Sequence, residues 1–200
     1  SMRHPDFVVL HPKRGLLILE VKDWKLDTIQ SITKSDVSLL TDKGLKHAAN
    51  PLEQARQYAH AVVGVLEKDP QLVFSSGRMQ GKLLFPWAYG VVLANISRKQ
   101  FESTDLSEVL ESHRVICQDE MVESAEAEAF QKRLWDMFTV GGFGKLGLPQ
   151  IDRVRWHMFP EIRLSGNQGD LFGGDDAEAA DLPDILRVMD LQQEQLARSL

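Results

Sequence analysis

The chain opens with two short apolar runs on either side of a turn. Phe7–Leu10 and Leu16–Leu19 flank Lys13-Arg14-Gly15, a three-residue loop with glycine in its last place. Glycine accepts the positive φ that such hairpin loops require there. This pattern predicts a hairpin with strands over 6–12 and 16–24. Odd and even positions are both apolar in these runs, which is typical of strands buried on both faces.

An asparagine and a proline predict the start of the first helix. Asn50 is placed as the N-cap, Pro51 takes the first helical position, and Glu53 is the expected reciprocal partner of a capping box. Apolar residues then recur at helical spacing as far as Leu66. Lys68-Asp69-Pro70 marks the end of this helix.

The remaining elements follow from alternation, apolar runs and glycine or proline breaks. We expect a polar strand pair over 27–33 and 38–41, buried strands over 87–96 and 113–117, partial helix over 98–110, an amphipathic helix over 124–140, a closing strand over 151–162 and a last helix over 183–200. The stretch SGNQGDLFGGDDAEAAD is rich in glycine and aspartate and is typical of a linker. The expected organisation is a domain over 1–164, a linker over 165–182 and a terminal segment over 183–200.

Length and composition restrict the class of protein. Two hundred residues, of which 43% are hydrophobic, can bury one substantial core. The longest apolar runs fall far short of the roughly 18–20 residues that cross a bilayer, and no charged-then-apolar signal segment opens the chain. Cys117 is the only cysteine, so neither a disulfide framework nor a thiolate metal cluster is expected. These features predict a soluble, cytoplasmic protein with no membrane partner.

The formal net charge of −6 is concentrated in one segment. Six carboxylates lie close together there without a lysine or arginine between them: Asp170, Asp175, Asp176, Glu178, Asp181 and Asp184. The rest of the chain is formally neutral. It shows no global basic footprint for nucleic acid, but a neutral body can still carry a local basic groove.

Three charges lie at the open end of the predicted hairpin. The loop Lys13-Arg14-Gly15 would place Asp6 opposite Lys22, with Glu20 two residues away on the same strand. Directly opposed residues share a face, so Asp6, Glu20 and Lys22 should converge on one side of the sheet. A two-residue loop would instead put Asp6 on the other face.

Two convergent carboxylates and a lysine suit phosphodiester chemistry. A hard divalent cation such as Mg²⁺ takes oxygen ligands, keeps waters and can bridge to a phosphate. A neighbouring lysine can orient the attacking water or neutralise charge that develops on the phosphorus oxygens. The alternative is structural: Asp6 begins a strand, while Glu20 and Lys22 form a surface salt bridge at the end of its partner.

The phrase PDFVVLHPKRGLLILEVKDW resembles the PD-(D/E)XK nuclease signature and, within that superfamily, the central motif of the nuclease-related NERD domain. The resemblance implies an α/β fold of the restriction-endonuclease type, with a central mixed sheet flanked by helices. It also implies a nuclease acting on DNA with Mg²⁺ or Mn²⁺. Asp6, Glu20 and the Val21 carbonyl would be the metal ligands, and Lys22 the catalytic lysine.

A second part of the likeness lies on the predicted helix. Gln54 and Tyr58 are four residues apart on one helical face and resemble the Q-x-x-x-Y motif of RecB-like nucleases, which adds both to the expected active site. Alternatively, Tyr58 is a core aromatic and Gln54 its neighbour. The superfamily usually places a helix with an acidic residue before the hairpin, whereas only four residues precede Pro5 here. A degenerate fold that binds DNA or docks onto a helicase without cutting is therefore the rival expectation.

The end of the chain resembles a different family. ILRVMDLQQEQLARSL is similar to the entry helix of Rep/UvrD-type superfamily I helicases, in which Gln193 would be the glutamine that reads adenine. The resemblance implies that the chain is the N-terminal piece of an ATP-dependent DNA helicase used in DNA repair. No G-x-x-x-x-G-K-[ST] is present, so ATP would be a cofactor of the intact helicase alone. The alternative is an ordinary amphipathic packing helix.

Other motifs carry little weight. Residues 142–147 match G-x-G-x-x-G but follow a predicted helix and not a strand, so a loop is expected. Cys117 lies in an apolar strand and no G-x-S-x-G is present, which makes a cysteine or serine hydrolase a poor expectation. The four tryptophans, Trp24 among them, are expected to be core or interface residues.

Overall fold

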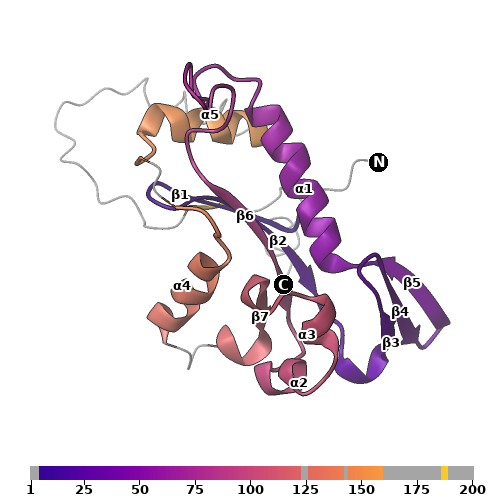
Figure 1. The fold of residues 1–200 in the computed structure, drawn as a ribbon. Helices are drawn as coiled ribbons and strands as arrows, with labels where there is room; N and C mark the ends of the chain where they lie inside the picture. Colours follow the sequence, from indigo (N-terminus) through magenta and orange to yellow (C-terminus); the bar gives the residue numbers. More distant parts are fainter. Residues whose placement is uncertain (1–4, 123–125, 142–143, 160–185, 189–200) are drawn as a thin grey trace, which may run out of the picture.

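A five-stranded mixed sheet forms the centre of the molecule. The computed structural model describes residues 5–122, 126–141, 144–159 and 186–188. The strand order is β7-β6-β2-β1-β8, in which β1 is antiparallel to both β2 and β8, while β2, β6 and β7 are parallel (Figure 1). The strands are β1 (Phe7–His11), β2 (Gly15–Lys22), β6 (Trp87–Leu93), β7 (Val115–Cys117) and β8 (Leu186–Val188).

Helices cover both faces of this sheet, as the expected α/β class requires. On one face, α1 (Pro51–Leu66) and α5 (Leu148–Met158) pack against the even-numbered hairpin residues, such as Leu16 and Ile18 (Figure 1). On the other face, α4 (Ala127–Asp136) and the residues after it pack against odd-numbered residues, such as Leu17. The hairpin is therefore buried on both faces, as its continuous apolar runs predict.

A short helical region closes the β7 edge of the sheet. It contains α2 (Arg98–Glu102), α3 (Leu106–Val109), η2 (Ser112–Arg114) and η3 (Gln118–Glu120). Arg98 and Arg133 both bind the Glu120 carboxylate, at 2.7 and 2.6 Å. This pair of contacts joins α2 to α4 through η3. The helix expected over 124–140 is shorter in the structure, and the partial helix expected over 98–110 is present as α2 and α3.

A second, three-stranded antiparallel sheet stands beside the start of α1 (Figure 1). We call this sheet the arm. It follows η1 (Leu26–Thr28) and consists of β3 (Ile29–Ile32), β4 (Asp36–Thr41) and β5 (Gly44–Ala49). The first two strands were expected, but β5 was not, because GLKHAA has few β-branched residues and no regular alternation.

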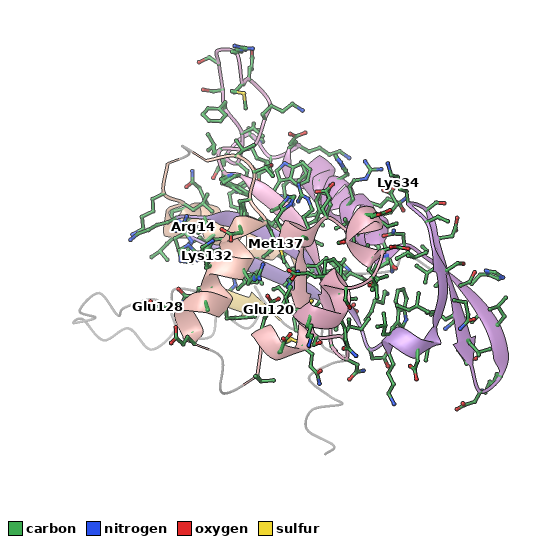
Figure 2. All side chains as sticks on the ribbon, turned by 60° about the horizontal axis from the view of Figure 1, so that its bottom comes forward. Arg14, Lys34, Glu120, Glu128, Lys132 and Met137 are labelled. Atoms are coloured by element: carbon green, nitrogen blue, oxygen red, sulfur yellow. The ribbon has the colours of Figure 1, made fainter. Side chains whose placement is uncertain are left out.

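Asn50 joins the arm to α1. Its side-chain oxygen accepts hydrogen bonds from the backbone N–H groups of Leu52 and Glu53, and its amide donates to the Thr33 carbonyl in the β3–β4 turn. Lys34 of the same turn lies near α1 (Figure 2). The N-cap prediction is confirmed. The expected hydrogen bond from the Asn50 backbone N–H back to the Glu53 side chain is not formed. The Glu53 carboxylate instead binds Arg56 and Gln57, one turn further along α1.

The hairpin register differs from the sequence prediction by two residues. His11 pairs with Gly15 and Leu10 with Leu16, so that 12–14 is the loop, where we expected Leu10 opposite Ile18. Gly15, with φ of +104°, begins the second strand and lies against Pro86, whose carbonyl oxygen would be 2.0 Å from an added Cβ. This close approach fixes glycine at the first paired position. A shift of two residues keeps every side chain on its expected face.

Two expectations for the last part of the chain are wrong. Residues 148–158 form a helix, whereas a strand was expected over 151–162. Pro149 in the first turn fits a helix start, and Ile151 and Val154, three residues apart, enter the core together. Residues 186–188 pair as a strand with β1, whereas a helix was expected over 183–200. The linker expected over 165–182 and the remainder of the last helix lie outside the described residues.

Gly90 in β6 allows α4 to approach the sheet closely. An added Cβ would lie 2.3 Å from the sulfur of Met137 and 2.8 Å from the Arg114 carbonyl oxygen. Met137 is fully buried directly after α4 (Figure 2). In the hairpin loop, the Arg14 guanidinium lies 5.7 Å from the centre of the Trp135 ring (Arg14 is labelled in Figure 2). None of the described helices is long and apolar enough to cross a membrane.

Candidate active site

Asp6 lies immediately before β1 and reaches the end of β2. Its Oδ2 accepts a hydrogen bond of 2.8 Å from the backbone N–H of Val21. Asp6 therefore lies beside Glu20 and Lys22, although the strand register differs from the prediction, in which Asp6 was opposite Lys22. Because the two-residue shift preserves the faces, Glu20 and Lys22 remain on the side of the sheet that α1 covers.

Glu20 and Lys22 form a largely buried ion pair. The Glu20 residue is only 4% exposed, and the Lys22 side chain 17%. The lysine Nζ lies 2.5 Å from Oε1 of Glu20. A carboxylate in this environment costs several kcal/mol unless a positive charge or hydrogen bonds compensate it. The arrangement is therefore more buried than the exposed salt bridge that was the structural alternative.

α1 supplies the next contact. Gln54 Oε1 lies 3.4 Å from the Lys22 Nζ, and Gln54 Nε2 donates a hydrogen bond of 2.9 Å to the Tyr58 hydroxyl. Gln54 and Tyr58 are one helical turn apart on the same flank of α1. Tyr58 also packs against the core between α1 and the hairpin, so it is both a core aromatic and a partner of Gln54. A continuous polar chain runs from Glu20 through Lys22 and Gln54 to Tyr58.

The donor set fits a hard divalent cation. The Asp6 and Glu20 carboxylates, with the carbonyl of Val21 directly after Glu20, offer oxygen ligands only. Mg²⁺ is commonly held by one or two carboxylates and keeps several waters. No group of three or more histidine, cysteine, aspartate or glutamate residues suited to a metal occurs in the described part of the chain. The residues therefore suit a water-rich magnesium or manganese site better than a closed zinc site.

Trp24 belongs to the same surroundings and was not among the expected site residues. Its ring centre lies 5.7 Å from the Lys22 Nζ. Two contacts hold the backbone here: the Lys22 carbonyl accepts from the Ala94 N–H at 2.8 Å, and the Asp23 carbonyl accepts from the Asn95 side chain at 2.6 Å. The sequence could have placed Trp24 in the site. It lies two residues after Lys22, just beyond β2, and residues two apart in an extended chain project to the same side.

The other motifs considered in the sequence do not belong to the site formed by Asp6, Glu20 and Lys22. Cys117 is fully buried, and burial raises the pKa of its thiol to about 12, so the thiolate needed for nucleophilic attack is not formed near neutral pH. Residues 144–147 form a loop before α5, as expected, while 142–143 lie outside the described residues. Gln193 also lies outside them, so its expected role in adenine binding is not tested.

Comparison with protein families gives a match over the part of the chain that carries these residues. The model of the NERD family, the nuclease-related domain, matches residues 1–92, slightly less than half of the chain. The matched part includes the hairpin, the arm, α1 and most of β6. It indicates a nuclease-related function for this region. No curated protein and no solved structure was found to match the chain.

Proposed function

We propose that the chain is a metal-dependent nuclease domain that hydrolyses phosphodiester bonds in DNA. The single observation that carries the proposal is the position of Lys22, whose Nζ lies 2.5 Å from Glu20 and 3.4 Å from Gln54. A structural salt bridge needs one carboxylate partner. Here a neutral helix residue also contacts the lysine, and Asp6 is bound to the neighbouring backbone.

Asp6, Glu20 and the Val21 carbonyl would hold Mg²⁺ or Mn²⁺. A bound ion of this kind supplies Lewis-acid activation of the phosphate and lowers the pKa of a coordinated water. Lys22 places a positive charge where negative charge develops on the phosphate oxygens during attack. Gln54 limits the positions that the Lys22 ammonium can take. Tyr58 in turn accepts from the Gln54 amide and fixes which side of that amide faces the lysine.

The wider context in a DNA helicase is part of the same proposal. It rests on the sequence likeness of residues 185–200 to a superfamily I entry segment, although 186–188 form a strand here and not a helix, with Gln193 reading adenine and ATP bound by the intact helicase. A nuclease domain on such a motor would act on strands that the motor exposes, which fits DNA processing or repair. The helicase core would then be the partner of this domain within the same protein.

A second candidate is a degenerate nuclease fold that binds DNA or docks onto the helicase without cutting it. The observation that favours it is the small acidic set: within the described residues, no third carboxylate joins Asp6 and Glu20 in a metal-binding group. DNA binding by either form should weaken steeply as the salt concentration rises. Only the first candidate requires a metal ion for product formation.

Cleavage of labelled single- and double-stranded DNA with Mg²⁺ or Mn²⁺ separates the two candidates. We expect metal-dependent product from the unchanged chain, abolished by chelation and reduced about 100-fold or more in Glu20→Gln and in Lys22→Met. Glu108→Gln is the matched control, because Glu108 is an exposed carboxylate on α3. Equal cleavage by all four proteins would point to a contaminant. DNA binding without any metal-dependent product would establish the second candidate.

A further inference from the structure

Trp24 presents an aromatic ring beside the proposed catalytic lysine. Its ring centre is 5.7 Å from the Lys22 Nζ, the atom that also contacts Glu20 and Gln54. It follows β2 by two residues and precedes η1. The ring is therefore a close neighbour of the position where a scissile phosphate would lie.

This tryptophan is not explained by the hydrophobic core. It is half-buried, and among the described residues it neither belongs to the three core clusters nor packs against them, in contrast to Trp87 and Trp135. Its flanking residues Asp23 and Lys25 are exposed. Of the two expectations for Trp24, core or interface, the core is therefore excluded.

The backbone that carries Trp24 is held firmly. Hydrogen bonds from the Ala94 N–H and the Asn95 side chain fix the carbonyls of Lys22 and Asp23, which belong to two consecutive peptide units. Both donors follow β6, the strand next to β2. A stacking platform needs a fixed base, and these hydrogen bonds fix the backbone from which the Trp24 ring projects. Lys25 adds an exposed positive charge one residue further on.

We propose that Trp24 stacks on an unpaired nucleobase next to the scissile phosphate, which makes single-stranded DNA or an unpaired strand end the substrate class. The inference rests on the proposed function for the position of the phosphate. Within a duplex, both faces of an internal base are covered by its neighbours, so an aromatic ring can stack only on a base that is unpaired or terminal. Stacking of this kind tolerates any base, because every base has a π-face.

The test combines binding and cleavage with single abasic sites. A labelled dT15 strand is compared with versions in which one base at a time is removed, for the unchanged chain, Trp24→Ala and Trp24→Phe. In the unchanged chain, one abasic position should weaken binding roughly tenfold and reduce cutting at an adjoining phosphate. In Trp24→Ala, intact dT15 should already bind roughly tenfold more weakly, and the abasic penalty at that position should disappear. Trp24→Phe should restore part of both.

Trp156→Ala is the matched control, since Trp156 is 37% exposed on α5, away from the hairpin end. It should keep both the affinity and the abasic penalty. An equal penalty in the unchanged chain and in Trp24→Ala would overturn the inference, as would equal binding of dT15 and a closed circular duplex, which has no unpaired or terminal base. Trp24-dependent binding without cleavage would instead contradict the nuclease function while supporting the stacking site. Absence of both binding and cleavage would overturn both proposals.

Discussion

At the scale of single residues, Gly90 shows how one missing methyl group sets the distance between two layers. Met137 and the Arg114 carbonyl occupy the space where a Cβ would lie. The carbonyl belongs to the backbone and cannot rotate away. The close packing of Met137 against the sheet therefore depends on glycine at this position.

Gly90→Ala should destabilise the fold by about 1–3 kcal/mol, the usual cost of overfilling a packed core. Thermal unfolding followed by circular dichroism measures the change. Gly64→Ala is the control, because no atom lies within 4 Å of its added Cβ in α1. That substitution should stabilise the helix by about 0.5–1 kcal/mol. A Gly90→Ala protein as stable as the unchanged chain would show that Met137 can move without cost.

The site residues were predictable to different degrees. Asp6, Glu20 and Lys22 could be brought together from the hairpin alone, since a register error of two residues leaves their faces unchanged. The contact between Lys22 and Gln54 joins residues 32 apart and came only from a resemblance. Trp24 was missed because a tryptophan is more often a core or interface residue than a stacking platform.

At the scale of elements, one buried carboxylate adds to the apolar packing of Ile151 and Val154 in holding α5 against the rest of the fold. Asp69, which is 3% exposed and follows α1, accepts hydrogen bonds at 2.7 Å from both Arg153 and His157, one turn apart on α5. The Gln71 N–H binds its other oxygen. The hydrogen bonds from Arg153 hold the pKa of the Asp69 carboxyl well below its usual range, with smaller contributions from His157 and Gln71.

This lowered pKa predicts a specific acid sensitivity. Because the pKa of Asp69 is lower in the folded state, its stabilisation is complete above the unfolded pKa of about 3.9 and is lost as the pH falls toward the folded value. Asp69→Asn should therefore cost about 3 kcal/mol near pH 7, and the difference from the unchanged chain should shrink below about pH 4. Urea unfolding at several pH values measures it.

The exposed Asp42 in the arm provides a control for this acid dependence. Asp42→Asn should change stability by less than about 0.5 kcal/mol at every pH. A deficit for Asp69→Asn that stayed constant down to pH 2 would show that the carboxylate charge is not what fastens α5.

Elements with strong local signals were predictable, and those defined by distant contacts were not. α1 has an N-cap and a proline that mark its start, and both act within a few residues. α5 was mistaken for a strand because its buried positions, Ile151 and Val154, are β-branched and few. β5 and β8 exist through pairing with β4 and β1, which their own residues do not specify.

At the scale of the whole molecule, the residues that match the NERD family are fewer than the residues that build the folded domain. The match ends at residue 92, inside β6. The sheet beyond that point continues into β7, and α4 and α5 cover its two faces. A fragment of residues 1–96 would expose Val9 and Leu17 on the face that α4 covers, and on the other face it would keep α1 but lose α5.

We expect the 1–96 fragment to lack a cooperative unfolding transition and to bind the dye ANS, because one apolar face has lost its cover and the other keeps only α1. A fragment of residues 1–159 contains all three large helices and should unfold cooperatively. Circular dichroism melting and dye fluorescence, with the full chain as reference, compare the two. Cooperative unfolding of the shorter fragment would show that the matched region folds without α4 and α5.

The order of the strands also has a consequence for how the chain reaches its folded state. β1 and β2 are joined by a three-residue loop and can pair within microseconds, whereas the pairing of Leu16 with Trp87 must first close a loop of about 70 residues. Asp6 and Val21 meet within the hairpin, while Lys22 meets Gln54 only after α1 has docked. During synthesis, the contact between Asp6 and the end of β2 can therefore form before α1 docks and Gln54 orients the Lys22 side chain.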